Sequence, residues 1–163
     1  MIMIVAADKN WGIGIKGGLL TNLPEDMKFF RETTKNSVVI MGRKTLESFP
    51  EKKPLKNRVN IVITKSGNIS GEGVIIVSSV EEAAEKAKEY ADKKVFVIGG
   101  GSVYKQMLKY CDTAYITTID HVFENADTFI DNMDELDDWK IVEISDVKEY
   151  NGIKFNFVTY KRQ

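Results

Sequence analysis

The feature that most constrains this chain is the segment VFVIGGGSVY at residues 95–104. Its first four residues are apolar, which predicts a short strand that is buried on both faces of a sheet. Three glycines follow, and Ser102–Leu108 then has apolar residues at helical spacing. A strand, a glycine turn and a helix can present unpaired backbone N–H groups to an anion. The segment therefore indicates an α/β fold with either a phosphate-binding turn or a tight turn that binds nothing.

Two further segments have the same order of strand and polar turn. Ser37–Met41 is apolar and leads through Gly42-Arg43-Lys44-Thr45 into a short helix, and Val59–Thr64 leads into Lys65-Ser66-Gly67-Asn68. In a parallel sheet such turns lie along one edge, where a dinucleotide with separated phosphates could bind two of them. The alternative is that these cations are only solvated. For Arg58, at the end of a basic loop, the residues alone favour solvation over a bidentate pair with a carboxylate.

A glycine-rich segment matches the dinucleotide fingerprint G-x-G-x-x-G at Gly12, Gly14 and Gly17. That fingerprint requires a helix to begin at the glycines, and no helical pattern begins before Pro24. We therefore reject the fingerprint and predict a loop that closes over a ligand. The alternative is a plain surface loop.

A helix is predicted from Pro24, since proline suits the first helical position. Asp26 lies within the apolar stripe of this helix, although burying a carboxylate is unfavourable unless a partner offsets the cost. A ligand with two parallel N–H donors would do so. The alternative is a carboxylate that only caps the helix from a partly exposed position. The stripe that we expect to be buried consists of Leu23, Met27, Phe30 and Thr34.

The remaining elements are predicted from the same kinds of pattern. Val74–Val77 is expected to be a strand, and Ser79 and Glu82 resemble a capping box that begins a helix. Asn151-Gly152 predicts a hairpin turn, so the last third of the chain adds antiparallel strands to the parallel sheet. The strands expected there are Thr113–Asp120, Asp127–Ile130, Trp139–Ile144 and Ile153–Tyr160.

The composition excludes several classes of protein. The chain has 163 residues, enough for one domain, and a net charge of −1, so we expect no nucleic-acid or membrane partner. With one cysteine, Cys111, and one histidine, His121, we expect no disulfide and no His/Cys metal site. Cys111 is expected in the core and His121 on the surface. The cysteine usage favours the cytoplasm, and difficult chemistry would have to come from a cofactor.

Several motifs, in their order and spacing, resemble the dihydrofolate reductase family of the bacterial type across the whole chain. The resemblance implies one domain over residues 1–163, with a mixed, mostly parallel, eight-stranded twisted sheet, helices on both faces and a C-terminal antiparallel hairpin. It implies a monomer that uses NADPH to reduce 7,8-dihydrofolate to tetrahydrofolate for one-carbon metabolism, and a target of antifolates. The matching segments are Ile4–Ala7, Gly12–Gly14, Leu23–Asp26, Val39–Thr45, Arg58–Val62, Ile98–Tyr104 and Asp127-Thr128.

The site residues of that family carry over by position. The resemblance implies that Asp26 holds the amino-pyrimidine edge of the pterin, with the Thr117 hydroxyl behind it, and these two are the implied catalytic residues. It implies that Arg58 binds the glutamate carboxylate and that apolar residues surround the pterin and aminobenzoyl rings. The implied substrate-binding residues are Ile4, Val5, Asp26, Met27, Phe30, Phe49, Leu55, Arg58, Ile98, Tyr104 and Thr117.

The resemblance also implies a site for NADPH and no metal. Basic residues near the adenosine phosphates favour NADPH over NADH, and the Gly99–Gly100 peptide bond is expected to be cis. The implied cofactor-binding residues are Ala6, Ile13, Gly14, Leu19, Gly42, Arg43, Lys44, Thr45, Thr64, Lys65, Ser66, Gly99, Gly100, Gly101, Ser102, Val103, Tyr104, Gln106 and Thr128.

The chain departs from the family at Leu20-Thr21, where a Pro-Trp pair is usual, and at Ala126, where a glycine is usual. Thr21 keeps a hydroxyl but lacks the aromatic ring that normally packs beside the substrate. Two alternatives therefore accompany the reductase interpretation. One is a pyrimidine reductase of riboflavin synthesis, which shares the fold, and the other is a pterin or nucleotide binder without catalysis.

Overall fold

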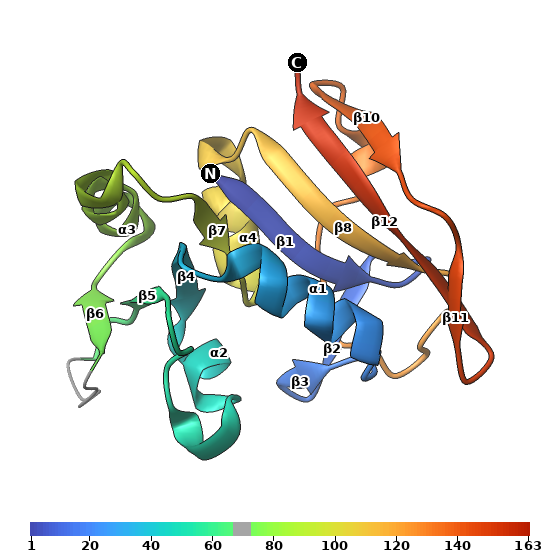
Figure 1. The fold of residues 1–163 in the computed structure, drawn as a ribbon, viewed down its shortest axis with the longest axis horizontal. Coiled ribbons are helices and arrows are strands. Elements are labelled where there is room, and N and C mark those ends of the chain that lie inside the picture. The colour runs from blue at the N-terminus through green and yellow to red at the C-terminus, as the bar shows by residue number, and fades with distance from the viewer. Residues whose placement is uncertain (67–72) are drawn as a thin grey trace.

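The computed structural model describes residues 1–66 and 73–163 as one main sheet with helices on both sides and a smaller sheet beside it (Figure 1). The helices are α1 (Pro24–Thr34), α2 (Arg43–Glu47), α3 (Val80–Ala87) and α4 (Gly101–Met107). Short 3₁₀ helices occupy Pro50–Lys52, Lys88–Tyr90, Leu108–Tyr110 and Met133–Glu135. The strands of the main sheet are β1 (Ile2–Ala7), β4 (Val38–Gly42), β5 (Val59–Ile63), β6 (Val74–Val77), β7 (Val95–Val97), β8 (Thr113–Ile119), β10 (Trp139–Ile144), β11 (Lys148–Tyr150) and β12 (Ile153–Arg162).

The main sheet is mixed and mostly parallel, as expected. Within the described residues its order is β10-β12-β8-β1-β7-β4-β5-β6, with β11 also paired to β12. The six strands from β8 to β6 are parallel to their neighbours, whereas β12 is antiparallel to β8, β10 and β11. Because β10 and β11 both pair with β12 along one edge, the sheet is eight strand positions wide. The predicted hairpin turn at Asn151-Gly152 joins β11 to β12.

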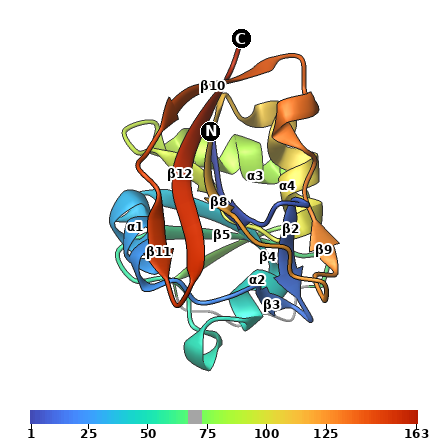
Figure 2. The ribbon, with the colours of Figure 1, turned by 90° about the vertical axis from the view of Figure 1, so that its right-hand side faces the viewer.

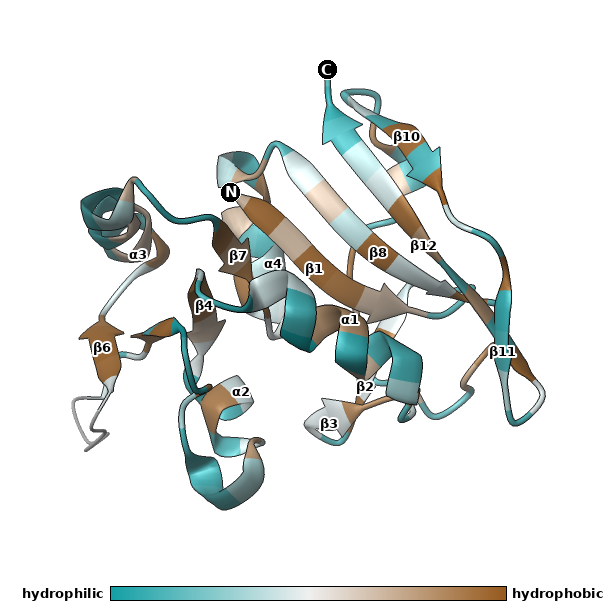
Figure 3. Cartoon of the chain, in the orientation of Figure 1, coloured by the Kyte–Doolittle hydropathy of each residue, from teal (hydrophilic) through white to brown (hydrophobic). Residues whose placement is uncertain are grey.

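The two faces of the sheet bury alternate residues of the central strands. Val38 and Ile40 belong to the core cluster that contains residues of α3 and α4, whereas Val39 and Met41 belong to the cluster against which α1 and α2 pack. In Figure 2, α1 lies on the opposite side of the sheet from α4, and in Figure 3 hydrophobic colouring covers much of β1 and β7. Strands buried on both faces explain why their sequences are apolar without alternation.

The glycine-rich segment is more ordered than the predicted loop. It forms β2 (Gly12–Ile15) and β3 (Gly18–Leu19), which pair with each other, while β2 also pairs with β9 (Thr128–Phe129). A second, three-stranded sheet of the order β3-β2-β9 results within the described part of the chain. No helix begins at these glycines, so rejecting the dinucleotide fingerprint was correct.

Helix α1 begins at Pro24 as predicted, but its stripe is only partly buried. Leu23 and Thr34 are buried, whereas Met27 is 48% exposed and Phe30 is half-buried. The prediction that Met27 is a core residue was wrong, because only part of the helix packs against the sheet. The same helix therefore leaves apolar surface open beside Asp26, which is itself half-buried.

Several local predictions are confirmed. The Ser79 hydroxyl caps α3 by accepting from the backbone N–H of Glu82 at 3.0 Å, although the Glu82 carboxylate accepts from Ser78 rather than from Ser79. Cys111 is buried and His121 is exposed. In the described ranges, none of the helices is both long and apolar enough to span a membrane.

Candidate functional site

The ends of β4 and β7 meet at the triple-glycine turn. The Gly42 N–H donates to the Gly99 carbonyl at 2.9 Å, and the Gly99–Gly100 bond is cis as expected. Gly99 has a φ of +122°, and a Cβ there would lie 3.3 Å from the Tyr104 ring and 3.5 Å from Thr45 Oγ1. A side chain at this position would therefore be strained and crowded, which explains the glycine.

The small sheet lies directly against the start of α4. A Cβ on Gly101 would come within 2.7 Å of Thr128 Cγ2, and a Cβ on Gly14 would lie 3.6 Å from Thr128 Cβ. The fold thus brings together three residues that were predicted to bind the cofactor and lie far apart in the sequence: Gly14, Gly101 and Thr128. On the exposed side of α4, Gln106 donates to Ser102 Oγ at 2.8 Å.

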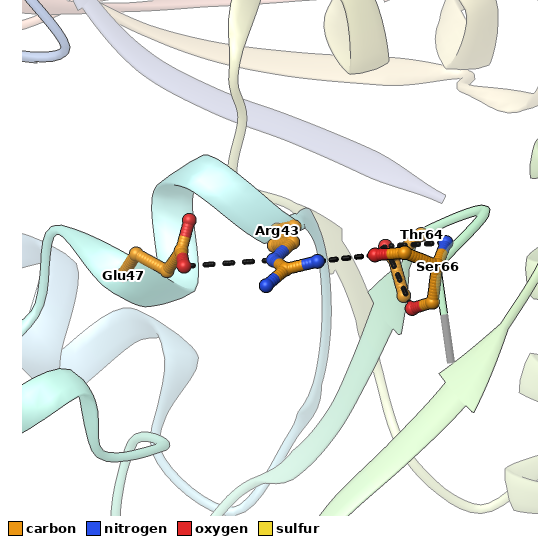
Figure 4. Close-up of polar contacts among 4 residues, drawn as sticks. All are labelled: Arg43, Glu47, Thr64 and Ser66. Carbon is orange, nitrogen blue, oxygen red and sulfur yellow. Dashed lines mark hydrogen bonds and ion pairs between the residues drawn. The ribbon is translucent and has the colours of Figure 1, made fainter. Parts of the chain in front are cut away.

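A polar cluster made of Arg43, Glu47, Thr64 and Ser66 lies beyond this turn, at the ends of β4 and β5 (Figure 4). The Arg43 guanidinium donates to Ser66 Oγ, and its Nε lies 3.5 Å from a Glu47 carboxylate oxygen. Ser66 Oγ is also 3.3 Å from Thr64 Oγ1. The cluster thus joins a cation and two hydroxyls, with the Glu47 carboxylate on the far side of the guanidinium, at the edge where an anion was predicted.

The neighbouring cations of this edge are open to solvent. Lys44 and Lys65 are both exposed. Gly67 and Asn68, part of the predicted polar turn, lie outside the described residues.

Asp26 lies in the first turn of α1 and faces β8. Thr117 Oγ1 donates to Asp26 Oδ1 at 2.5 Å, across 91 residues of sequence. Burial raises the pKa of the Asp26 carboxyl, and the Thr117 hydrogen bond acts in the opposite direction. Burial, together with the charge of Asp26, raises the pKa of Tyr104. The carboxyl is therefore poised to exchange a proton or to bind a donor.

Tyr104 packs against the triple-glycine turn and is bonded to strand β1. Its hydroxyl donates to the Ile4 carbonyl at 2.8 Å, and a Cβ on Gly99 would lie 3.4 Å from the same oxygen. The buried phenol thus packs beside the glycine turn, and the Asp26 charge is near enough to affect its pKa. The two predicted sites are consequently close to each other.

Apolar residues surround the acidic site. Five of those predicted from the resemblance share one cluster, which we call the substrate-side cluster: Ile4, Phe30, Phe49, Leu55 and Ile98. Two further apolar residues predicted from the resemblance are not buried: Leu19 is largely exposed and Met27 is about half exposed. Val5 differs, since its side chain packs into the cluster on the opposite face of the sheet. Its predicted contact with substrate could therefore involve only its backbone.

Arg58 is less solvated than the residues alone favoured, since its side chain is half-buried. Its Nη2 donates to the Arg31 carbonyl at 3.3 Å, and its Nε is buried without a hydrogen-bond partner among the described residues. Burial and the nearby Arg31 charge both lower the pKa of Arg58. The side chain as a whole is only half-buried, so its terminal N–H groups can pair with a carboxylate.

Two acidic residues that the sequence did not single out fasten the glycine-rich segment. The Lys16 N–H donates to Asp127 Oδ2 at 2.8 Å, and this bond lowers the pKa of Asp127. Asp8, only 3% exposed, accepts from the backbone of Asn10, Gly12 and Phe123 at 2.8–3.0 Å. The one feature of the local sequence that could have indicated a buried Asp8 is that it directly follows an apolar strand. No group of three metal-binding side chains occurs in residues 1–66 and 73–163.

Fold and site together define an α/β nucleotide-binding protein with an acidic, apolar site beside the nucleotide edge. The comparisons identify the family. The family model described as dihydrofolate reductase matches residues 1–162. The chain is 35% identical over 162 residues to a dihydrofolate reductase of Bacillus subtilis, covering 98% of this chain and 93% of that protein. The chain belongs to the dihydrofolate reductase family.

A solved structure supports the same assignment. The dihydrofolate reductase from Enterococcus faecalis, complexed with NADP(H) and RAB-propyl, has a TM-score of 0.86 and 37% identity, covering 99% of this chain and 95% of that chain. Bifunctional dihydrofolate reductase-thymidylate synthases are also similar, and the one from Glycine max is 38% identical over 177 residues. The chain spans about a third of the length of these bifunctional relatives, 33% for the soybean protein.

Proposed function

We propose that this chain catalyses the NADPH-dependent reduction of 7,8-dihydrofolate to 5,6,7,8-tetrahydrofolate, by hydride transfer to pterin C6 and protonation of N5. The observation that carries the proposal is the half-buried Asp26, hydrogen-bonded to Thr117 and close enough to Tyr104, beside the triple-glycine turn, for its charge to raise the pKa of that phenol. A carboxylate that pairs with the N–H edge of a flat heterocycle loses little by burial, because the ligand supplies the missing donors.

NADPH fits the edge that runs from β2 to β5. The first N–H groups of α4, which begins at Gly101 without a side-chain cap, suit a pyrophosphate, and the side chains of Arg43, Thr64 and Ser66 suit the 2′-phosphate. When bound, NADPH supplies the hydride. The residues of the chain contribute by holding the nicotinamide and the pterin beside each other near Ile13 and Gly14.

Asp26 orients the pterin and controls its protonation. Thr117 already donates to Oδ1, and no other protein donor reaches this carboxyl among the described contacts, so Oδ2 is available to the amino-pyrimidine edge. The raised pKa of Asp26 keeps a proton at this carboxyl over a wider pH range than in water. Either Asp26 or a water held beside it delivers the proton to N5.

The rest of the substrate meets apolar and cationic groups. The substrate-side cluster offers walls for the pterin and aminobenzoyl rings, and the half-buried Arg58 guanidinium suits the glutamate carboxylate through its terminal nitrogens. The segment from Gly12 to Leu19 covers the site and excludes water during transfer. Its contacts with Asp127 support this role, because they hold the segment against β9.

We also infer that residues 1–163 act as one domain, as a monomer, in the cytoplasm and without nucleic acid. The main sheet, which extends from β10 to β6, contains both the first strand of the chain, β1, and the last, β12. This arrangement supports a single domain. The nearly balanced charge, −1 overall, supports the absence of a polyanionic partner. Sedimentation of the purified chain would test the monomer.

The test is a spectrophotometric assay with NADPH or NADH and dihydrofolate. We expect NADPH absorbance to fall only when dihydrofolate is added, and more slowly with NADH. Turnover of a ribosylated pyrimidine but not of dihydrofolate would favour the riboflavin-pathway alternative. Tight binding of NADPH and dihydrofolate without turnover at any pH would favour a non-catalytic binder.

A further inference from the structure

Asn60 is a polar residue in the otherwise apolar strand β5, and its side chain is only 2% exposed. A buried amide is unfavourable unless its oxygen and its N–H groups have partners. The Asn60 oxygen accepts from the Leu55 N–H at 3.0 Å, while its nitrogen donates to the carbonyls of Leu55 at 2.9 Å and Arg58 at 3.2 Å. All three bonds go to the backbone of the loop 55–58.

The two ends of this loop carry different chemistry. Leu55 packs in the substrate-side cluster, whereas the half-buried Arg58 guanidinium lies at the other end, and its Nε has no hydrogen-bond partner among the described residues. Asn60 bonds to neither side chain, but it ties the backbone of both residues to one point in the core. The distance and orientation between the apolar wall and the cation therefore depend on this amide.

We propose that Asn60 is a positioning residue for the carboxylate tail of the substrate. It acts through Leu55 and Arg58, so that an aromatic ring against Leu55 and a carboxylate on Arg58 are bound at the same time. The inference rests on the proposed function, because it assumes a substrate with such a tail. It goes beyond that function by assigning tail recognition to a residue that does not contact the substrate.

A purely structural role for Asn60 would have different consequences. Loss of stability alone would affect every substrate in the same way. Loss of positioning affects only a substrate whose tail reaches the loop, because the pterin itself is held by Asp26 on α1. Two substrates that differ only in the tail, 7,8-dihydrofolate and 6-methyl-7,8-dihydropterin, therefore separate the two roles.

The test is Asn60→Ala, assayed with both substrates and NADPH. We expect the KM for dihydrofolate to rise about 10-fold, with kcat changed less than about 2-fold, because a displaced Arg58 loses a charge-assisted bond. We expect kcat/KM for the methylpterin and the Kd for NADPH to change less than about 2-fold. Equal changes for both substrates, or no change for either, would overturn the proposal.

Asn132→Ala is the matched control, since it removes the same amide from a remote turn, where Asn132 accepts from the Asp134 N–H at 2.9 Å. It should leave both KM values unchanged. If Asn60→Ala does not fold by circular dichroism, Asn60→Ser carries the test with a smaller rise in the same KM.

A second measurement separates this proposal from the proposed function. If the wild-type chain turns over neither substrate, the proposed function fails, and calorimetric binding of p-aminobenzoylglutamate still tests Asn60. Weaker binding of this tail fragment by the Asn60 variant would support the positioning role. Equal binding by the variant and the wild type would overturn it.

Discussion

Replacing Asp26 with asparagine should separate the function of this carboxyl from its effect on stability. The change is nearly isosteric, and the amide oxygen can still accept from the Thr117 hydroxyl, now 2.5 Å from Oδ1. What is lost is the charge and the proton-binding oxygen. General acid–base groups typically contribute about 10²–10⁴-fold in rate. At about 1.4 kcal/mol per tenfold, Asp26→Asn should raise the barrier by about 3–5 kcal/mol.

The same variant should be more stable than the wild type at neutral pH. Burial raises the folded-state pKa of Asp26 above its model-compound value of 3.8. Between those two pKa values the folded chain binds more protons than the unfolded chain, so stability falls as pH rises through this window. The ionised carboxylate therefore costs stability at pH 7, and Asp26→Asn removes that cost. Below pH 3.8 the difference in Tm should disappear.

The assay measures kcat for dihydrofolate reduction at pH 7, the Kd for NADPH and the Tm by calorimetry. The control is Glu25→Gln, the same chemical change one residue earlier, at an exposed side chain that pairs with Lys148 at 2.9 Å. Such a surface pair contributes about 0–1 kcal/mol, so the control should keep full activity. A kcat for Asp26→Asn within about 3-fold of wild type, or an equal loss in Glu25→Gln, would refute the role of Asp26.

Three further changes test the neighbouring groups. Thr117→Val removes the hydrogen bond that lowers the pKa of Asp26, so the limb of the pH–rate profile that reports this carboxyl should move to higher pH. Gly101→Ala places a Cβ 2.7 Å from Thr128 Cγ2, so urea unfolding should show a loss of about 1–3 kcal/mol and calorimetry a weaker binding of NADPH. Arg43→Gln removes a cation that suits the 2′-phosphate, so the ratio of kcat/KM for NADPH over NADH should fall about 10-fold or more.

Each of these changes has an outcome that contradicts the reasoning. For Gly101→Ala the control is Gly18→Ala, where the added Cβ would be an ordinary 3.6 Å from the Ile15 carbonyl. Equal stability loss in the two variants would contradict the crowding argument. An unmoved pH profile in Thr117→Val, or an unchanged cofactor ratio in Arg43→Gln, would remove that residue from its proposed role.

Much of the local structure could be predicted from the sequence. The apolar runs of β4, β5, β6 and β7, the proline start of α1 and the Asn151-Gly152 turn were all located from short patterns. Such patterns act over a few residues, where the chain itself decides backbone geometry and which side chains must leave water. The triple glycine could also be predicted as a turn, because its requirement for bare backbone is local.

The contacts that make the site depend on the tertiary structure. Asp26 meets Thr117 across 91 residues, and Tyr104 meets Ile4 across 100. Both contacts depend on the order of strands in the sheet. That order cannot be predicted from the pattern of residues within a single segment. Burial of the Arg58 Nε also depends on packing, and the residues alone had favoured a solvated side chain.

By itself, the sequence determined where most strands, turns and helices of the main sheet lie and, through the resemblance of several motifs, the family, but it missed the strands β2, β3 and β11. Only the tertiary structure decided which side of each element is exposed, as Met27 and Val5 illustrate. It also decided what the polar residue within β5 does, since the partners of Asn60 lie in a loop whose path the sheet imposes. The physical reason is that backbone preferences are short-ranged, whereas burial and pairing depend on which distant segments share a surface.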